Sequence, residues 1–381
     1  ANAQLIMEST GPTTATQLIG SGLLQSNGAV SGFGIFSNAA LGWNAVVPLE
    51  TRNASNYILA FDNTNGLVTG VAIANLSTTA ANVPVIIRDD TGAQIGTTTI
   101  SLPAQGHQSF MLNAQYSSTS NLRGTIEFDT PQGGQITVLG LRAVGGALTT
   151  LPVLANVGTG GGSIAHATYN GGFTSVFYIV NTGTAAADFT LNFFDESGNP
   201  LQAPLLLPQT GTNVTTAALT KTLAAGAMLV VQTVADDKAA SIAGSATLTS
   251  KGNISGFEIF RWTTFGQEAS VPLETRSPGS YVLVFDDTNA TTTGVAIANG
   301  AAAPVNVTVN IRSDAGALLK TLQVALPAQG HKSFLLPDLD ATTNGVRGSA
   351  EFVVPLGGKI SVIGLRARAD GTLTTIPLLT K

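Results

Sequence analysis

The sequence Val-Pro-Leu-Glu-Thr-Arg occupies residues 47–52 and returns at residues 271–276. Pro48 and Pro272 are therefore 272 − 48 = 224 residues apart. The two copies remain similar on both sides at the same offset; the further matching pairs are 31–36 with 255–260, 69–75 with 293–299 and 102–107 with 326–331. A fixed period of this kind indicates a tandem architecture, in which each repeat folds as one structural unit.

The stretch after Arg52 is a series of short runs rich in β-branched and apolar residues. The expected strands are 57–61, 71–74, 83–88, 96–102, 107–112, 124–128, 135–142 and 148–153. Turn signals every 8–12 residues or so between such runs are typical of a β-sandwich. The expected core is Leu59, Val71, Ile73, Val85, Ile87, Phe110, Ile126, Phe128, Val138 and Leu141, with Val295, Ile297 and Phe352 in the second copy. Only residues 215–225 favour a helix.

The middle of the chain is a diverged copy of the same unit. Asn181 ends a strand run as Asn75 does, 181 − 75 = 106 residues earlier. The 224-residue period is therefore a pair of related modules, type B followed by type A. We predict an all-β chain of tandem Ig-like (fibronectin III-like) β-sandwich modules; the expected boundaries are a half-module of type B at 1–51, module A at 52–157, module B at 158–275 and module A again at 276–381.

Three segments resemble an unnamed pair of repeats found in large secreted proteins of soil bacteria. Residues 164–175 resemble its opening, and residues 70–75 and 136–142 resemble its later part. These segments are strand and turn patterns, so the resemblance implies a fold and a setting. It implies an exported, Ig-like tandem module, and it brings no catalytic residue with it.

The composition narrows the setting and the partners. Charged residues make up only 10% of the chain, the net charge is −5, and Cys is absent. A chain with no basic cluster is a poor nucleic-acid partner, and no stretch reaches the ~20 apolar residues that a membrane span needs. Without Cys there are no disulfides and no thiolate metal sites. With only 17 Lys and Arg, the chain offers trypsin-like proteases few sites, which suits an extracellular or cell-surface location.

The residues that carry catalysis in other proteins are sparse here. His107 and His331 occupy the same repeat position, after Ala-Gln-Gly, and His166 stands alone in module B. A catalytic triad needs a base beside a nucleophile, and no nucleophile motif accompanies these histidines. We therefore expect structural histidines, no cofactor and no enzymatic activity.

Two weaker site hypotheses come from acidic and aromatic residues. Asp62, Asp286 and Asp287 lie in acidic stretches that offer oxygen ligands to calcium, although Asp and Asn in such stretches more often bond their own backbone in hairpin turns. No twelve-residue calcium loop is present. Trp43 and Trp262 are the two Trp residues of the chain, and they are the candidates for contact with a glycan.

Glu50 and Arg52, with their counterparts Glu274 and Arg276, lie at the junction between modules B and A. Residues two apart on a strand point to the same face. We expect them to fix the angle between modules through polar contacts with Arg142 or Arg366.

The N-terminal half-module is the least complete part of the repeat. Residues 5–26 match residues 229–250, the back half of module B, and a front half equivalent to 158–228 does not precede them. Half a sandwich leaves an apolar face and open strand edges that template pairing with another chain. The expected assembly residues are Leu5, Ile6, Leu23, Phe33 and Ile35.

Three explanations for the half-module remain open at this stage. The front half lies elsewhere or has been removed, or residues 1–51 join the strands of module A, or a neighbouring subunit supplies strands by complementation. Head-to-tail contacts of the last kind do not close and build filaments. The favoured function is an extracellular structural protein, a subunit of a surface filament or layer; the alternative is a secreted carbohydrate- or ligand-binding adhesive module.

Overall fold

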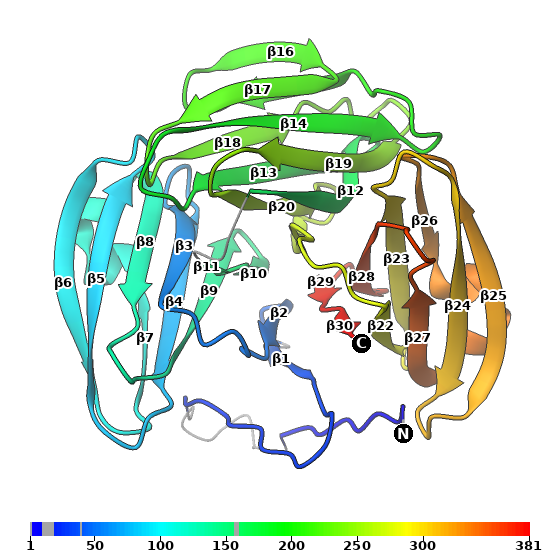
Figure 1. Cartoon of the computed structure of the whole chain (residues 1–381), viewed down its shortest axis with the longest axis horizontal. Helices are drawn as coiled ribbons and strands as arrows, with labels where there is room; N and C mark the ends of the chain where they lie inside the picture. Colours follow the sequence, from blue (N-terminus) through cyan, green and yellow to red (C-terminus); the bar gives the residue numbers. More distant parts are fainter. Residues whose placement is uncertain (1, 10–18, 39, 156–159) are drawn as a thin grey trace.

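The computed structural model describes residues 2–9, 19–38, 40–155 and 160–381. Nearly all of its regular structure is antiparallel β-sheet, so the all-β prediction is confirmed. Three β bodies stand around a common centre, and an N-terminal segment with a small hairpin lies on the fourth side (Figure 1). In the part of the chain described, no helix is long and apolar enough to cross a membrane.

The first A module is a pair of facing sheets with strand orders β10-β9-β4-β7 and β11-β3-β8-β5-β6. Its elements are β3 (Asn56–Asp62), β4 (Val68–Asn75), β5 (Ala81–Asp89), β6 (Gln94–Leu102), β7 (His107–Met111), α1 (Leu112–Gln115), a 3-10 turn η1 (Ser117–Thr119), β8 (Arg123–Asp129), β9 (Ile136–Val144), β10 (Ala147–Leu151) and β11 (Leu154–Ala155).

The second A module repeats this arrangement strand for strand, with orders β26-β23-β28-β29 and β25-β24-β27-β22-β30. Its elements are β22 (Ser280–Asp286), β23 (Thr291–Asn299), β24 (Val305–Ser313), β25 (Leu318–Leu326), β26 (His331–Leu335), α2 (Leu336–Leu339), η2 (Ala341–Thr343), β27 (Arg347–Val353), β28 (Ile360–Arg368), β29 (Leu373–Ile376) and β30 (Leu379–Thr380). The repeat in the sequence is therefore a repeat of structure.

The predicted core of the A modules is mostly confirmed. The fully or nearly fully buried members are Leu59, Val71, Ile73, Val85, Ile87, Ile126, Phe128, Val138, Val295, Ile297 and Phe352. Phe110 is only partly buried, with its ring against that of Tyr116. Leu141 is also only partly buried. Because side chains alternate along a strand, Leu141 lies on the face of β9 opposite to Val138, so its predicted phase was wrong.

Module B is one ten-stranded sheet. Its strands are β12 (Gly161–Asn170), β13 (Phe173–Asn181), β14 (Ala187–Asp195), β15 (Ala203–Leu207), β16 (Thr212–Thr216), β17 (Ala218–Leu223), β18 (Met228–Thr233), β19 (Ile242–Ser250), β20 (Ile254–Trp262) and β21 (Gln267–Pro272). The helix predicted over residues 215–225 is wrong, because β17 pairs with the edge of β14 from Leu223 to Ala218 and buries Leu219 and Leu223.

Strand β13 lies inside the module B sheet and has a partner strand on each edge. β13 pairs with β18 on one side and with β20 on the other, so that Val176 is opposite both Gln232 and Ile259. β20 in turn pairs with β21.

The N-terminal hairpin consists of β1 (Phe33–Asn38) and β2 (Trp43–Pro48), which form a two-stranded sheet of their own. At the 224-residue offset it is the counterpart of β20 and β21. It adds no strand to the sheets described for the first A module, so the hairpin does not extend that sandwich as one of the three explanations had it.

Candidate assembly site

Four strands meet at the centre of the molecule, where β10 contacts β2 and β21, and β29 contacts the same two strands. Figure 1 labels β2, β10 and β29 there. The hydroxyl of Thr150 donates to the carbonyl of Val46, and the hydroxyl of Thr375 donates to the carbonyl of Ser270 at 2.6 Å. Ser270 is the counterpart of Val46, and Thr375 that of Thr150 after a one-residue insertion. Each A module therefore holds the B hairpin that precedes it in the same way.

The N-terminal segment also contacts the other A module as module B does. The backbone N–H of Gln4 donates to the carbonyl of Asp314 at 2.9 Å, and that of Met228 donates to the carbonyl of Asp90 at 3.0 Å. Gln4 and Met228 are 224 residues apart, and so are Asp90 and Asp314. The N-terminal segment thus lies against the second A module as module B lies against the first, and the four positions around the centre are related by a pseudo-two-fold axis.

The face of β1 agrees with this relation. Phe33 packs against the core of the second A module, as its counterpart Phe257 packs against the core of the first. Phe33 and Ile35 are two residues apart and share a face of β1. The structure therefore brings these two predicted assembly residues together at the junction with the second A module.

Much of the apolar surface of the N-terminal region is exposed. The exposed fractions of the remaining predicted assembly residues are Leu5 80%, Ile6 43%, Leu23 61% and Ile35 38%. Two of them have a buried apolar counterpart in module B: Ile6 corresponds to Val230 at 2%, and Ile35 to Ile259 at 0%. Leu229, the counterpart of Leu5, is partly buried, and the counterpart of Leu23 is Thr247. Phe36, which the sequence analysis missed, is 39% exposed where its counterpart Phe260 is 6% exposed. Phe36 is identified by comparing the exposure of each residue in the hairpin with that of its counterpart 224 residues later.

A buried polar cluster joins the first A module to module B. The guanidinium of Arg142 makes an ion pair with Glu268 at 2.8 Å and donates to the hydroxyl of Tyr178 at 2.5 Å. Arg261 also binds Glu268, at 2.9 Å. Arg142 and Glu268 are 4% and 2% exposed, and buried charges of this kind are stable only when paired and hydrogen-bonded.

The counterpart of this cluster at the other junction is incomplete. Arg366 corresponds to Arg142, but Glu268 corresponds to Asn44 and Arg261 to Ser37. Ser37 and Asn44 bond each other at 2.6 Å. Within the described residues the side chain of Arg366 has no hydrogen bond or ion pair, and burial lowers its pKa.

The contacts expected of Glu50 and Arg52 are wrong. Arg52 pairs with Glu50 two residues away and donates to the carbonyl of Val153 at 2.9 Å. Arg276 likewise pairs with Glu274 at 2.7 Å. The carboxylates also accept the backbone N–H of the same arginines, which makes each pair a local brace of the linker. The side chain that reaches Arg142 is instead Glu268.

The acidic calcium candidates close turns. Asp62 pairs with Arg123 at 2.8 Å, and Asp286 pairs with Arg347 at 3.0 Å; each also accepts from the Thr two residues on. Asp287 accepts the N–H of Thr293 at 2.6 Å, and burial raises its pKa to about 6. Among the described residues, no group of three or more His, Asp or Glu side chains gathers at one point.

The two tryptophans occupy opposite strands of equivalent hairpins. Trp43 is half-buried in β2 opposite Asn38, and Trp262 lies in β20 opposite Gln267. The Trp262 ring lies 5.9 Å from that of Phe173 and 4.3 Å from that of Phe265. Trp262 is therefore held in an aromatic cluster rather than offered as a free stacking platform.

Two of the three histidines meet at the junction of module B with the second A module. His166 Nδ1 and His331 Nε2 are 3.1 Å apart, and both rings are buried. Burial lowers the pKa of His166 to about 4 and holds that of His331 well below its usual value. His107, the counterpart of His331, is only partly buried. The His166–His331 contact was not predicted, because it joins residues of different modules.

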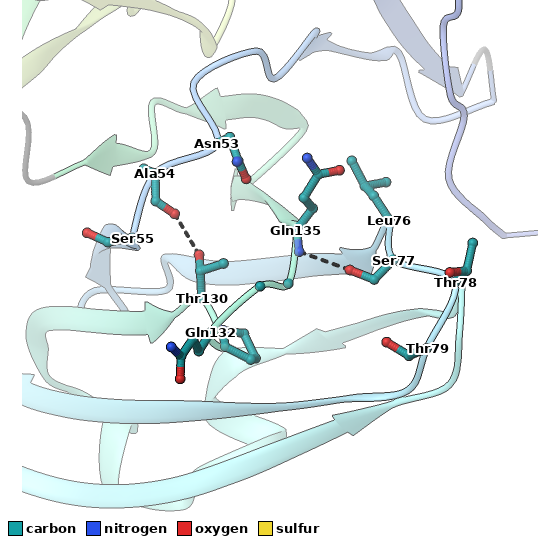
Figure 2. Close-up of a pocket in the computed structure, with 13 residues that line it drawn as sticks. Asn53, Ala54, Ser55, Leu76, Ser77, Thr78, Thr79, Thr130, Gln132 and Gln135 are labelled. Atoms are coloured by element: carbon teal, nitrogen blue, oxygen red, sulfur yellow. Dashed lines mark hydrogen bonds between the residues drawn. The ribbon is translucent and has the colours of Figure 1, made fainter.

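An open polar depression of about 700 Å³ lies at one end of the first A module (Figure 2). Its lining includes Asn53, Ser77, Thr130 and Gln132, with Thr130 donating to the carbonyl of Ala54 at 2.7 Å. The lining residues include no titratable and no aromatic side chain. It offers hydrogen bonds but neither an acid–base pair nor a stacking surface.

Comparison with protein-family models gives no match, and comparison with curated proteins gives none. Among solved structures, a GH2 β-galacturonidase from Eisenbergiella tayi bound to glycerol aligns with 81% of this chain and 42% of its own, at 9% identity. The TM-score is 0.17, so this likeness carries no argument about the fold or function of the chain.

Proposed function

We propose that the chain is a structural protein of the cell exterior, a unit of a filament or layer assembled by β-strand complementation at its N-terminal hairpin. The observation that carries the proposal is β1, which pairs with β2 alone in the described structure and exposes Ile35 and Phe36. An unpaired strand with exposed apolar side chains is a template for a strand from a neighbour.

The rest of the molecule fits a structural role. Low charge, few protease sites and modules braced by local ion pairs suit an exposed, load-carrying chain. The histidines pack against each other or lie in strands, and the acidic side chains close turns. We accordingly propose that it is not an enzyme, and that a unit joins the next head to tail, since unlike surfaces that meet without closure build extended assemblies.

The test is made in the cells that produce the protein. Immunogold electron microscopy with antibodies against this chain should label extracellular filaments or layers. The double variant Ile35→Lys, Phe36→Lys places one charge on each face of β1, at two exposed side chains, and should abolish the labelled assemblies. Leu41→Lys is the matched control, because Leu41 is 51% exposed at the hairpin turn, outside β1. Label confined to the cell interior, or assemblies that survive the double variant, would overturn the proposal.

A further inference from the structure

The fourth side of the molecule is a partial copy of module B. In module B, β13 lies between β18 and β20. The counterparts of both flanking elements are in place against the second A module: Gln4 stands for Met228 at the start of β18, and β1 stands for β20. Within the described residues no strand stands for β13.

The second A module places a partly buried guanidinium at that position, with no side-chain partner in the described structure. β13 carries Tyr178, whose hydroxyl accepts a hydrogen bond from Arg142 and whose ring lies 5.8 Å from its guanidinium. Arg366 is the counterpart of Arg142 and has no such partner in the described structure. A strand with a Tyr at the place of Tyr178 would supply it.

The first A module has a partly exposed face whose counterpart on the second A module is covered by module B. On the second A module, His331, Ala296 and Ile363 are buried, at 0%, 3% and 1%, against module B. Their counterparts on the first A module, His107, Ala72 and Leu139, are only partly buried. This face therefore corresponds to a surface that module B covers in the completed half of the molecule.

The front half of module B is not free to fill this position. Strand β13 is already flanked by β18 on one edge and by β20 on the other. A second copy that lent this segment to the N-terminal hairpin would uncover its own β20–β21 hairpin for each β1–β2 hairpin that it covered.

We infer that the fourth side binds the front half of a further B-type module, whose β13-like strand pairs with the free edge of β1 and sets a Tyr against Arg366. The inference rests on the proposed function and names the partner at the same hairpin. The occupant completes a pseudo-two-fold ring of four modules, B-A-B-A, around the central strands. The sequence of such an occupant would contain a strand of alternating apolar residues, followed by counterparts of β14 to β17 of module B.

The experiment uses the intact chain and an extended chain, in which a copy of residues 158–224 is placed directly before Ala1. Ala1 corresponds to Ala225, so the extension restores the uninterrupted repeat. The chain has no Cys, so Ile35→Cys introduces a single thiol whose maleimide labelling reports exposure. Labelling at position 35 should be fast in the intact chain and about tenfold or more slower in the extended chain, because reaction then requires local opening.

The control thiol is Leu41→Cys, which should label equally in both chains, since its counterpart Phe265 remains 48% exposed in the complete module B. An extension whose appended copy carries Phe177→Asp should leave position 35 reactive. In a second arm, residues 158–224 are coexpressed as a separate tagged segment, which should copurify with the intact chain and not with the Ile35→Lys, Phe36→Lys variant.

The inference is overturned if position 35 stays reactive in a folded extended chain and the tagged segment does not copurify. It is also overturned if position 35 of the unextended chain becomes protected as its concentration rises, since a second copy would then be the occupant. Neither result decides the proposed function, which is tested separately by the immunogold labelling of extracellular assemblies.

Discussion

Glu258 is a carboxyl group placed where a charge is costly. It lies in β20 with no exposed surface; Oε1 accepts from the hydroxyl of Ser175 at 2.5 Å, and Oε2 has no partner in the described structure. Burial raises its pKa to about 8. The folded chain therefore holds a proton on Glu258 at neutral pH, where the unfolded chain does not.

Glu258→Gln should flatten the pH dependence of stability. A folded pKa above the unfolded value of 4.5 gives stability that is complete below pH 4.5 and is lost as pH rises to about 8, by at most ~1.4 kcal/mol per pH unit. Gln mimics the protonated acid, so the variant should gain on the parent at pH 8 relative to pH 5. Urea unfolding at both pH values measures this, with the exposed Glu196→Gln as control. An unchanged difference between pH 5 and pH 8 would contradict the assignment.

His331→Gln tests the opposite slope. The unfolded chain takes up protons below pH 6.5, while buried His166 stays neutral until about pH 4 and His331 titrates lower than usual. Stability is therefore complete above pH 6.5 and falls as pH drops toward 4. The variant should lose part of this acid dependence, by at most ~1.4 kcal/mol per pH unit. His107→Gln is the repeat-matched control, and thermal unfolding at pH 5 and pH 7 should separate the two.

At the scale of elements, the strands of the A modules are readable from the sequence because their buried residues alternate. In β5, Val83, Val85 and Ile87 are buried and the residues between them are not. The errors have the same physical origin. Leu141 is apolar but sits out of phase with Val138, and residues 215–225 carry too little periodicity to separate an edge strand from a short helix.

Phe128→Ala and Phe352→Ala should destabilise the two A modules alike. Both side chains are fully buried at equivalent positions of β8 and β27. Removing a buried Phe costs about 3–5 kcal/mol from lost burial and the cavity left behind. Urea unfolding of each variant measures the cost, and Leu356→Ala, at a side chain that is fully exposed, should cost almost nothing. A cost below about 1 kcal/mol at either Phe would mean that the modules do not share one core.

At the scale of the whole molecule, the contacts that place the modules were beyond the sequence. Gln4 meets Asp314, and His166 meets His331, across distances in the chain that no local pattern reports. Of the candidate site, Phe33 and Ile35 were predicted because the half-module is visible in the repeat. Arg366 was not recognised as part of the site. Its role is visible only by comparison with Arg142, whose partner Glu268 is replaced by Asn44 at the other junction.

Arg142→Met and Arg366→Met compare the completed junction with the open one. Arg142 is 4% exposed and holds Glu268 and Tyr178 across the boundary between the first A module and module B. Removing one partner of a buried pair costs about 3–5 kcal/mol, because the other charge is left uncompensated. Arg261 still binds Glu268, which sets the expectation at the lower end, about 3 kcal/mol.

Arg366→Met should differ sharply from its counterpart. Arg366 is half-buried without a carboxylate or hydroxyl partner in the described structure, so Met keeps the packing of the side-chain stem and removes a charge that gains little. The expected change is within about 0.5 kcal/mol, as for a substitution that breaks no named contact. Urea unfolding followed by tryptophan fluorescence measures both variants. Equal costs would mean that the two junctions are energetically equivalent, and that the second A module already has all the contacts that module B gives the first.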